Sequence, residues 1–117
     1  MMAKIQRRLS AIWEEFVVYY MNIVGYIPFH LKRRFVYRLC GIKIGSGSTI
    51  HTRAIWYTTG GVSIGHDTIV GEGATLDGRG HITIGNHVDI ASDVMIYTSQ
   101  HDINSPTFAP IYGPVVI

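Results

Sequence analysis

The dipeptide Ile-Gly recurs in this chain at a fixed spacing of twenty residues. Its three copies are Ile44-Gly45, Ile64-Gly65 and Ile84-Gly85. The stretches 42–61, 62–81 and 82–101 therefore align as three copies of one unit. A unit of this length cannot bury its apolar face alone, so successive copies stack on one another. The period thus predicts a solenoid for the second half of the chain.

A shorter period of six residues runs inside these units. The large apolar residues that follow it are Ile44, Ile50, Trp56, Val62, Ile64, Val70, Leu76, Ile82, Ile84, Ile90 and Ile96. Four residues after most of them stands a small side chain, such as Ser48, Ala54 or Ala74. A period of six fits neither an amphipathic helix nor a simple alternating strand. It fits a coil of three short strands whose i and i+4 side chains point inward, stacked as parallel strands about 4.8 Å apart.

The corners of such a coil need residues that tolerate a positive φ. Gly47, Asp67, Gly73 and Asp93 stand at the expected corners, and glycine and aspartate are among the residues that adopt this conformation. The repeats therefore predict an all-β solenoid of about three coils.

The six-residue period, with Ile-Gly followed by a small residue, resembles the hexapeptide-repeat acyltransferases, in particular the maltose- and galactoside-type and glycan O-acetyltransferases. The resemblance implies a left-handed parallel β-helix for residues 42–117. It also implies O-acetyl transfer from acetyl-CoA to a sugar or polysaccharide precursor, and a homotrimer with active sites between β-helices. A cytoplasmic location, or a peripheral one at the inner face of the membrane, follows as an expectation.

After Ile96 the six-residue rhythm breaks, and a loop with three prolines occupies residues 97–114. Functional residues are often found on such loops. By the resemblance, His101 in this loop is the general base that takes a proton from the acceptor hydroxyl. Imidazole suits this role because its ordinary pKa of about 6.5 leaves it mostly neutral at pH 7. Asp102 would either orient the ring or contact the acceptor.

The coil before the histidine supplies further candidates. Galactoside-type enzymes carry an asparagine there, near the acceptor, whereas the aligned stretch 70–77 of this chain has none. Glu72 and Asp77 are the candidate substitutes, so the acceptor need not resemble a galactoside. His81 stands in the same repeat column as His101. We therefore expect the two histidines one coil apart and include His81 among the substrate-binding candidates.

A zinc site is an alternative interpretation of the histidines, because β-helix proteins resembling γ-class carbonic anhydrases bind zinc. Those proteins carry a His-x4-His pair, whereas His81 and His87 are separated by five residues. We expect no metal, and we expect His51, His66 and His87 to be outward-facing corner residues.

Residues 1–41 follow a helical period and are expected to form a separate N-terminal segment. Their apolar side chains lie three or four residues apart: Ile5, Leu9, Ile12, Phe16, Tyr20, Ile23 and Ile27. Pro28 ends this pattern, and apolar residues at a spacing of four continue it to Gly41. The run 16–29 is nearly all apolar, but fourteen residues are too few to cross a bilayer, which needs about twenty.

This segment is also basic. Residues 1–43 hold eight of the ten Lys and Arg against two Glu, a net charge of +6, whereas the remaining residues carry −4.

Two interpretations of the N-terminal segment follow, and both can hold. The helices cover the open end of the solenoid, where an unpaired sheet edge would aggregate. Alternatively, the tyrosine-rich helix and the cluster Lys32-Arg33-Arg34 lie on an anionic membrane surface.

The sequence disfavours a nucleic-acid partner and a disulfide-forming compartment. Aromatic and basic residues do not interleave along the repeats, as they would on a nucleic-acid-binding surface. Cys40 is the only cysteine, so there is no disulfide framework and a cytosolic setting is favoured.

The length of the chain leaves a second function class open. Members of the family it resembles continue for several coils, which line the CoA groove, beyond the point matching Ile117. We therefore expect that the chain is partial or that another chain covers its last coil, and that 117 residues alone transfer acetyl groups weakly or not at all. The alternative to an enzyme is a non-catalytic, truncated β-helix module.

Overall fold

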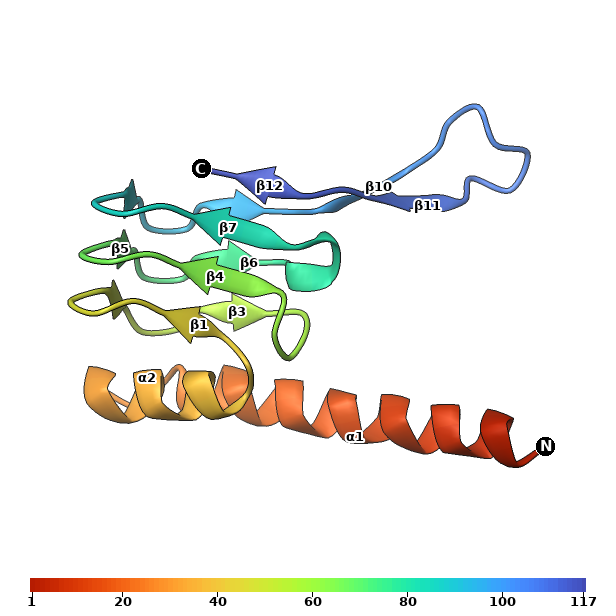
Figure 1. The fold of residues 1–117 in the computed structure, drawn as a ribbon, viewed down its shortest axis with the longest axis horizontal. Coiled ribbons are helices and arrows are strands. Elements are labelled where there is room, and N and C mark those ends of the chain that lie inside the picture. Colours follow the sequence, from red (N-terminus) through yellow and green to blue (C-terminus); the bar gives the residue numbers. More distant parts are fainter.

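A computed structural model describes all 117 residues. Two helices, α1 (Met2–Val24) and α2 (His30–Leu39), lie beneath a stack of short strands (Figure 1). The strands are β1 (Lys43–Ile44), β2 (Thr49–Ile50), β3 (Ile55–Trp56), β4 (Val62–Ile64), β5 (Ile69–Val70), β6 (Thr75–Leu76), β7 (Ile82–Ile84), β8 (Asp89–Ile90), β9 (Met95–Ile96), β10 (Ser99–His101), β11 (Pro110–Tyr112) and β12 (Val115–Val116). A short 3₁₀ turn, η1, spans Gly78–Gly80.

The strands form three parallel sheets, which are the three faces of a solenoid. Their strand orders are β1-β4-β7-β12, β2-β5-β8 and β3-β6-β9. Paired residues are twenty apart in the sequence, as in Ile50 with Val70 and Trp56 with Leu76. The predicted parallel β-solenoid of about three coils is therefore confirmed, and β12 begins a fourth coil on the first sheet only.

The residues predicted to point inward fill the interior. Ile50, Val70 and Leu76 have no exposed surface, and the small residues Ser48 and Ala74 are equally buried. The glycine after the isoleucine has a steric reason in the first two units. A Cβ atom at Gly65 would lie 2.7 Å from the carbonyl carbon of Gly85 in the next coil, and one at Gly45 would meet Gly65 in the same way.

The corners adopt the predicted backbone conformation. Gly47, Asp67, Gly73 and Asp93 all have positive φ. Arg53, which the sequence analysis did not single out, and His87, which it expected at a corner, share this conformation because they occupy the same repeat columns. A bulky residue tolerates the left-handed region there because the coils stacked on it determine the local path.

The lowest coil raises a problem of unpaired carbonyl groups. In the coils above, the carbonyls of Ile64, Thr68 and Val70 accept hydrogen bonds from amides of the coil below. The corresponding carbonyls twenty residues earlier have no coil beneath them. A buried carbonyl without a partner costs about 1–3 kcal/mol, so this edge needs donors from elsewhere.

Three arginines of α2 supply those donors. Arg38 Nη2 donates to Ile44 over 2.9 Å, Arg34 Nη1 to Ser48 over 3.0 Å, and Arg33 Nη2 to Ile50 over 2.9 Å. On the third face, Asn22 of α1 both donates to and accepts from the main chain of Trp56. The helices therefore cap the solenoid, as one of the two interpretations predicted.

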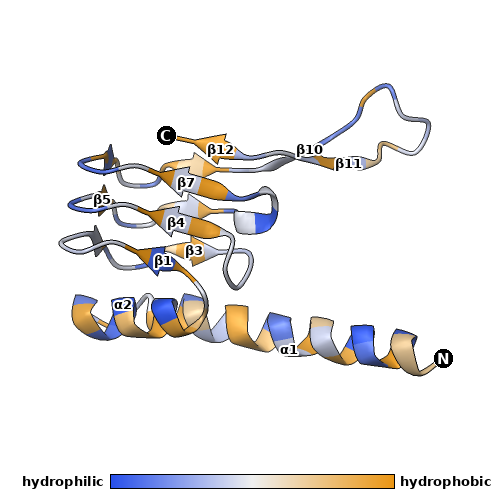
Figure 2. Ribbon diagram, viewed as in Figure 1, coloured by the Kyte–Doolittle hydropathy of each residue, from blue (hydrophilic) through white to orange (hydrophobic).

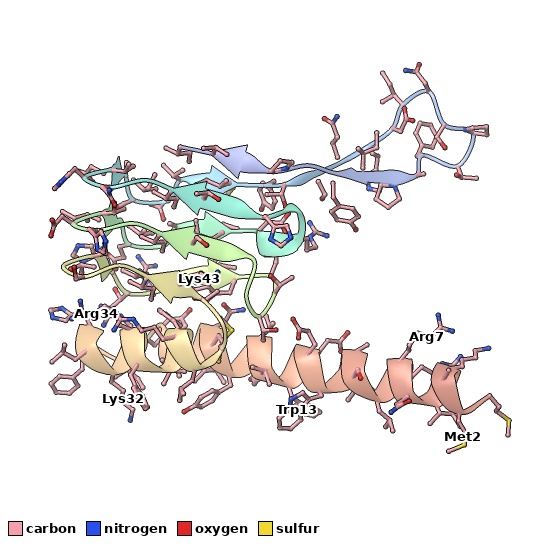
Figure 3. The ribbon with its side chains drawn as sticks, in the orientation of Figure 1. Met2, Arg7, Trp13, Lys32, Arg34 and Lys43 are labelled. Carbon is pink, nitrogen blue, oxygen red and sulfur yellow. The ribbon has the colours of Figure 1, made fainter.

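This arrangement corrects the expected role of the Lys32-Arg33-Arg34 cluster. Arg33 is only 3% exposed and Arg34 is half-buried, because both point toward the solenoid. Figure 3 shows Arg34 on the solenoid side of α2 and Lys32 on the opposite side. Only Lys32 of the three is free to contact another surface.

No helix is both long and apolar enough to cross a membrane.

Most of the apolar stripe predicted along residues 5–27 is not the surface of α1 that packs against the solenoid. The buried apolar residues of the two helices are Met21, Val24, Val36 and Tyr37. The stripe from Ile5 to Ile23 points away from the solenoid, and only Ile27 at its end packs against the core. The C-terminal half of α1 contacts the coils, beginning with Glu14, whose carboxylate accepts hydrogen bonds from Thr59, and the N-terminal half extends beyond them (Figure 1).

Replacing Arg33 tests the cap. We expect Arg33→Ala to lower the free energy of unfolding by about 2–3 kcal/mol, because the carbonyls of Ile50 and Ile27 lose a charged donor. Urea unfolding followed by circular dichroism measures the loss. Lys32→Ala is the matched control and should change stability by less than about 0.5 kcal/mol. Equal effects of the two substitutions would contradict the capping role.

Candidate active site

A β-hairpin leaves the stack at the end of the third coil and extends sideways from it (Figure 1). Its strands β10 and β11 are antiparallel, with His101 paired to Pro110 and Ser99 to Tyr112. The chain then returns through β12, which pairs with β7. The predicted loop 97–114 is therefore partly ordered by main-chain pairing, and His101 stands at the last position of β10.

The ring of His101 is held by one hydrogen bond. Its Nδ1 lies 2.7 Å from the carbonyl oxygen of Phe108. A carbonyl oxygen only accepts, so Nδ1 must carry the proton and donate. The neutral ring then has its lone pair on Nε2, which makes no hydrogen bond within the chain, and the residue is exposed. This is the tautomer that a general base requires.

Phe108 reaches this position through an uncommon backbone conformation. Its φ is +49°, a region that bulky residues rarely enter. The turn is held by the amide of Phe108, which donates to Ser105 over 3.1 Å, and by the amide of Asp102, which donates to Ala109 over 2.9 Å. The sequence did not indicate Phe108, because its contribution is a carbonyl group that every residue possesses.

Asp102 does not hold the imidazole ring. Its Oδ1 accepts a hydrogen bond from the amide of Asn104 over 2.9 Å, which orders the tip of the hairpin. The Phe108 carbonyl, and not Asp102, therefore orients the His101 ring. Of the two roles considered for Asp102, contact with the acceptor stays a prediction.

Asp77 anchors the root of the hairpin from the coil below. Its carboxylate is fully buried and accepts from Arg79 Nε over 2.7 Å, from Arg79 Nη2 over 2.9 Å and from the amide of Thr98 over 3.1 Å. Arg79 also donates to Ser99 Oγ over 3.0 Å, which ties the corner of one coil to the first residue of β10. Both oxygens of Asp77 are thus occupied inside the chain, which makes Asp77 a positioning residue.

The ion pair explains the pKa of this carboxyl group. The hydrogen bonds from the Arg79 guanidinium, together with the amides of Thr98 and Arg79, outweigh the effect of burial and lower the pKa of Asp77 to about 2. The carboxylate therefore stays charged throughout the physiological range.

Two tyrosine rings, those of Tyr57 and Tyr112, lie near the same guanidinium group, and Tyr97 packs against Tyr57. The central guanidinium carbon of Arg79, Cζ, lies 5.0 Å from the centre of the Tyr57 ring and 5.7 Å from the centre of the Tyr112 ring. The hydroxyl of Tyr57 donates to that of Tyr97 over 3.4 Å. Each of the three tyrosine residues is 40–49% exposed. Beside them, residues 97–100 and 111–115 line a hollow of about 240 Å³ at the base of the hairpin.

Glu72 lies at a different corner of the coil from the hairpin. It follows β5, whereas the hairpin leaves after β9 on the third sheet. Its carboxylate forms an exposed ion pair with Arg53 over 2.9 Å. The structure therefore does not bring Glu72 to His101.

The predicted stacking of His81 under His101 is wrong. The amide of Val115 donates to the carbonyl of His81 over 3.0 Å, and Val115 pairs with Ile82. The returning strand thus occupies the place above His81, because the chain leaves the stack before residue 101 and carries His101 away.

His66 and His87 lie at corners of the solenoid, and His30 begins α2. His66 accepts from the amide of Ser46 through Nδ1 over 3.0 Å, and His87 lies 3.9 Å from Asp67 Oδ2. No three side chains of His, Cys, Asp or Glu lie close enough together to hold a metal ion.

Comparison of the chain with protein-family models, with curated proteins and with solved structures found no match. The class that the structure itself defines is a short parallel β-solenoid with a two-helix cap.

The Asp77–Arg79 pair predicts a pH-dependent stability. Because the folded pKa of Asp77 is depressed, its contribution is fully present above about pH 4 and is lost as pH falls toward 2. We expect Asp77→Asn to cost about 2 kcal/mol at pH 7 and progressively less in acid. Thermal unfolding of both proteins from pH 7 to pH 2 measures this difference. A difference that stays constant down to pH 2 would contradict the assignment.

Proposed function

We propose that this chain belongs to an O-acyltransferase that moves an acetyl group from acetyl-CoA to a hydroxyl group of a saccharide. The observation that carries the proposal is the geometry of His101. Its Nδ1 is bonded to the Phe108 carbonyl, so an unprotonated Nε2 is offered on an exposed hairpin. The resemblance of the repeats to hexapeptide acyltransferases supplies the reaction class.

In the proposed step, Nε2 of His101 removes the proton from the acceptor hydroxyl as its oxygen attacks the thioester carbonyl carbon. The carbon–sulfur bond breaks, the CoA thiolate leaves and receives the proton from the imidazolium. The products are the acetyl ester and free CoA. The Phe108 carbonyl stabilises the imidazolium, because the Nδ1–H bond strengthens when the ring becomes positive.

The root of the hairpin supports a saccharide as the acceptor. The exposed rings of Tyr57, Tyr97 and Tyr112 offer flat apolar faces beside phenol hydroxyls. Together with the neighbouring hollow, they give the mixture of aromatic and polar lining that small-molecule sites use. The proposed site therefore combines a base on β10 with a binding surface between the hairpin and the third sheet.

Removing the imidazole tests the mechanism. In this chain or in a longer parent protein, whichever transfers acetyl groups, we expect His101→Ala to lower kcat by about 10² to 10⁴ while the melting temperature stays unchanged. His66→Ala and His87→Ala, at exposed corners, are the matched controls and should retain activity. Nitrogen NMR of the labelled protein gives a readout independent of turnover, because it should find the His101 proton on Nδ1. Full turnover in His101→Ala would overturn the mechanism.

A homotrimer is part of the proposal, and the outer surface of the third sheet supports it. Ile55 is 44% exposed and Met95 is 67% exposed on this sheet, which leaves apolar surface for a neighbouring solenoid. Light scattering should give three times the 13.1 kDa chain mass, and Met95→Glu should lower it. A monomer at micromolar concentration would contradict this assembly.

A further inference from the structure

The side of the two helices that faces away from the solenoid is apolar. The residues on it are Ile5, Leu9, Ile12, Phe16, Tyr19, Ile23, Leu31, Phe35 and Leu39, each 46–72% exposed. We call this surface the outer helical face. An apolar patch of this extent on a folded domain indicates a partner surface.

The solenoid does not use this face. The packing side of the helices carries Met21, Val24, Val36 and Tyr37, which are all buried against the coils. Figure 1 shows both helices along the same end of the stack, and Figure 2 shows apolar positions recurring along both of them. The outer helical face is therefore one-sided and lies at the end of the molecule opposite β12.

The charge of this end is strongly positive and uncompensated. Residues 1–43 carry a balance of +6, and none of their Lys or Arg side chains forms an ion pair. Arg33, Arg34 and Arg38 bind neutral carbonyls, so their charges persist. Lys32 projects from the same side as the outer helical face (Figure 3). The rest of the chain carries −4, which gives the molecule an oriented charge distribution.

Aromatic residues with a polar group border the face. Trp13 is 70% exposed and Figure 3 shows it pointing away from the solenoid, and Tyr19 on the face itself is 67% exposed. Indole and phenol side chains are favoured where one end meets hydrocarbon and the other meets water. Glu15 is exposed next to Phe16 and is the acid nearest to this surface.

We propose that the outer helical face lies in the plane of an anionic phospholipid surface, with its apolar side chains in the acyl boundary. A helix of 23 residues is about 35 Å long, so α1 covers several lipids without crossing the bilayer. A second copy of this chain is the disfavoured occupant, because it would bring two ends of charge +6 together.

Fluorescence of Trp13 reports the contact directly. The chain has two tryptophans, and Trp56 is 1% exposed, so a lipid-dependent change comes from Trp13. We expect a blue shift with vesicles of phosphatidylcholine and phosphatidylserine, quenching by brominated lipid, and no shift in Trp13→Phe. Binding should weaken as salt rises, because the surface attraction is screened over about 8–10 Å. Vesicles of phosphatidylcholine alone should bind at least tenfold more weakly.

Substitutions separate the apolar and the electrostatic contributions. Phe16→Ser with Phe35→Ser should reduce vesicle partitioning by about tenfold or more, because two exposed rings lose their burial in lipid. Ile103→Ser with Val116→Ser removes two residues that are 81% and 77% exposed elsewhere, and should bind as the parent does. Lys4→Glu with Arg8→Glu should weaken binding to anionic vesicles only. The melting temperature checks that each variant is folded.

Two outcomes would overturn the proposal. One is binding that is absent, or equal for neutral and anionic vesicles, in the folded parent. The other is an oligomer in solution that dissociates in Phe16→Ser with Phe35→Ser while vesicles do not bind, which would assign the face to a second copy. A trimer that persists in Phe16→Ser with Phe35→Ser would be held together by the sheets and not by the outer helical face, and the membrane proposal would stand.

Discussion

Main-chain hydrogen bonding between successive coils is the interaction on which the rest of this structure depends. Each strand has only two or three residues, so no strand pair is stable by itself. Stability arises because each coil pairs with its neighbours on all three faces, while the apolar columns exclude water from the interior. The same interaction makes the end of the stack costly, since a terminal coil has carbonyls with no neighbouring amides.

The two helices resolve this cost at the lower end in a specific way. A helix cannot extend a parallel sheet, but arginine side chains carry several donors on a long stem. Three arginines of α2 therefore take the place of the amides of a missing coil. Using arginine for this purpose leaves the cap positively charged, because the partners are neutral. The charge asymmetry of the molecule is in part a consequence of how the stack is closed.

The hairpin is the place where the chain departs from the stack. After β9 the chain leaves the third coil instead of forming its last corner. Antiparallel pairing between β10 and β11 then replaces the hydrogen bonds of the parallel sheet that are lost there. The departure is anchored by the buried carboxylate of Asp77, which joins the corner of the second coil to Thr98. His101 thus stands on a paired strand whose root is rigidly attached, and its ring is oriented by the turn at Phe108. The hairpin and the outer helical face lie at opposite ends of the stack, so acyl transfer and membrane contact would use separate surfaces (Figure 1).

The sequence by itself determined the solenoid, because a twenty-residue period with apolar residues every six positions is compatible with few other folds. It also indicated the helices, the positive-φ corners at Gly47 and Asp67, and the departure after Ile96. Only the tertiary structure decided which helical face packs, because the stripes on both sides of α1 and α2 contain apolar residues and burial depends on what lies opposite. It likewise separated His101 from His81, turned Arg33 inward and brought the Phe108 carbonyl to the imidazole. These contacts involve main-chain groups or residues that are distant in the sequence. Because main-chain groups are the same in every residue, no side-chain pattern predicts such contacts.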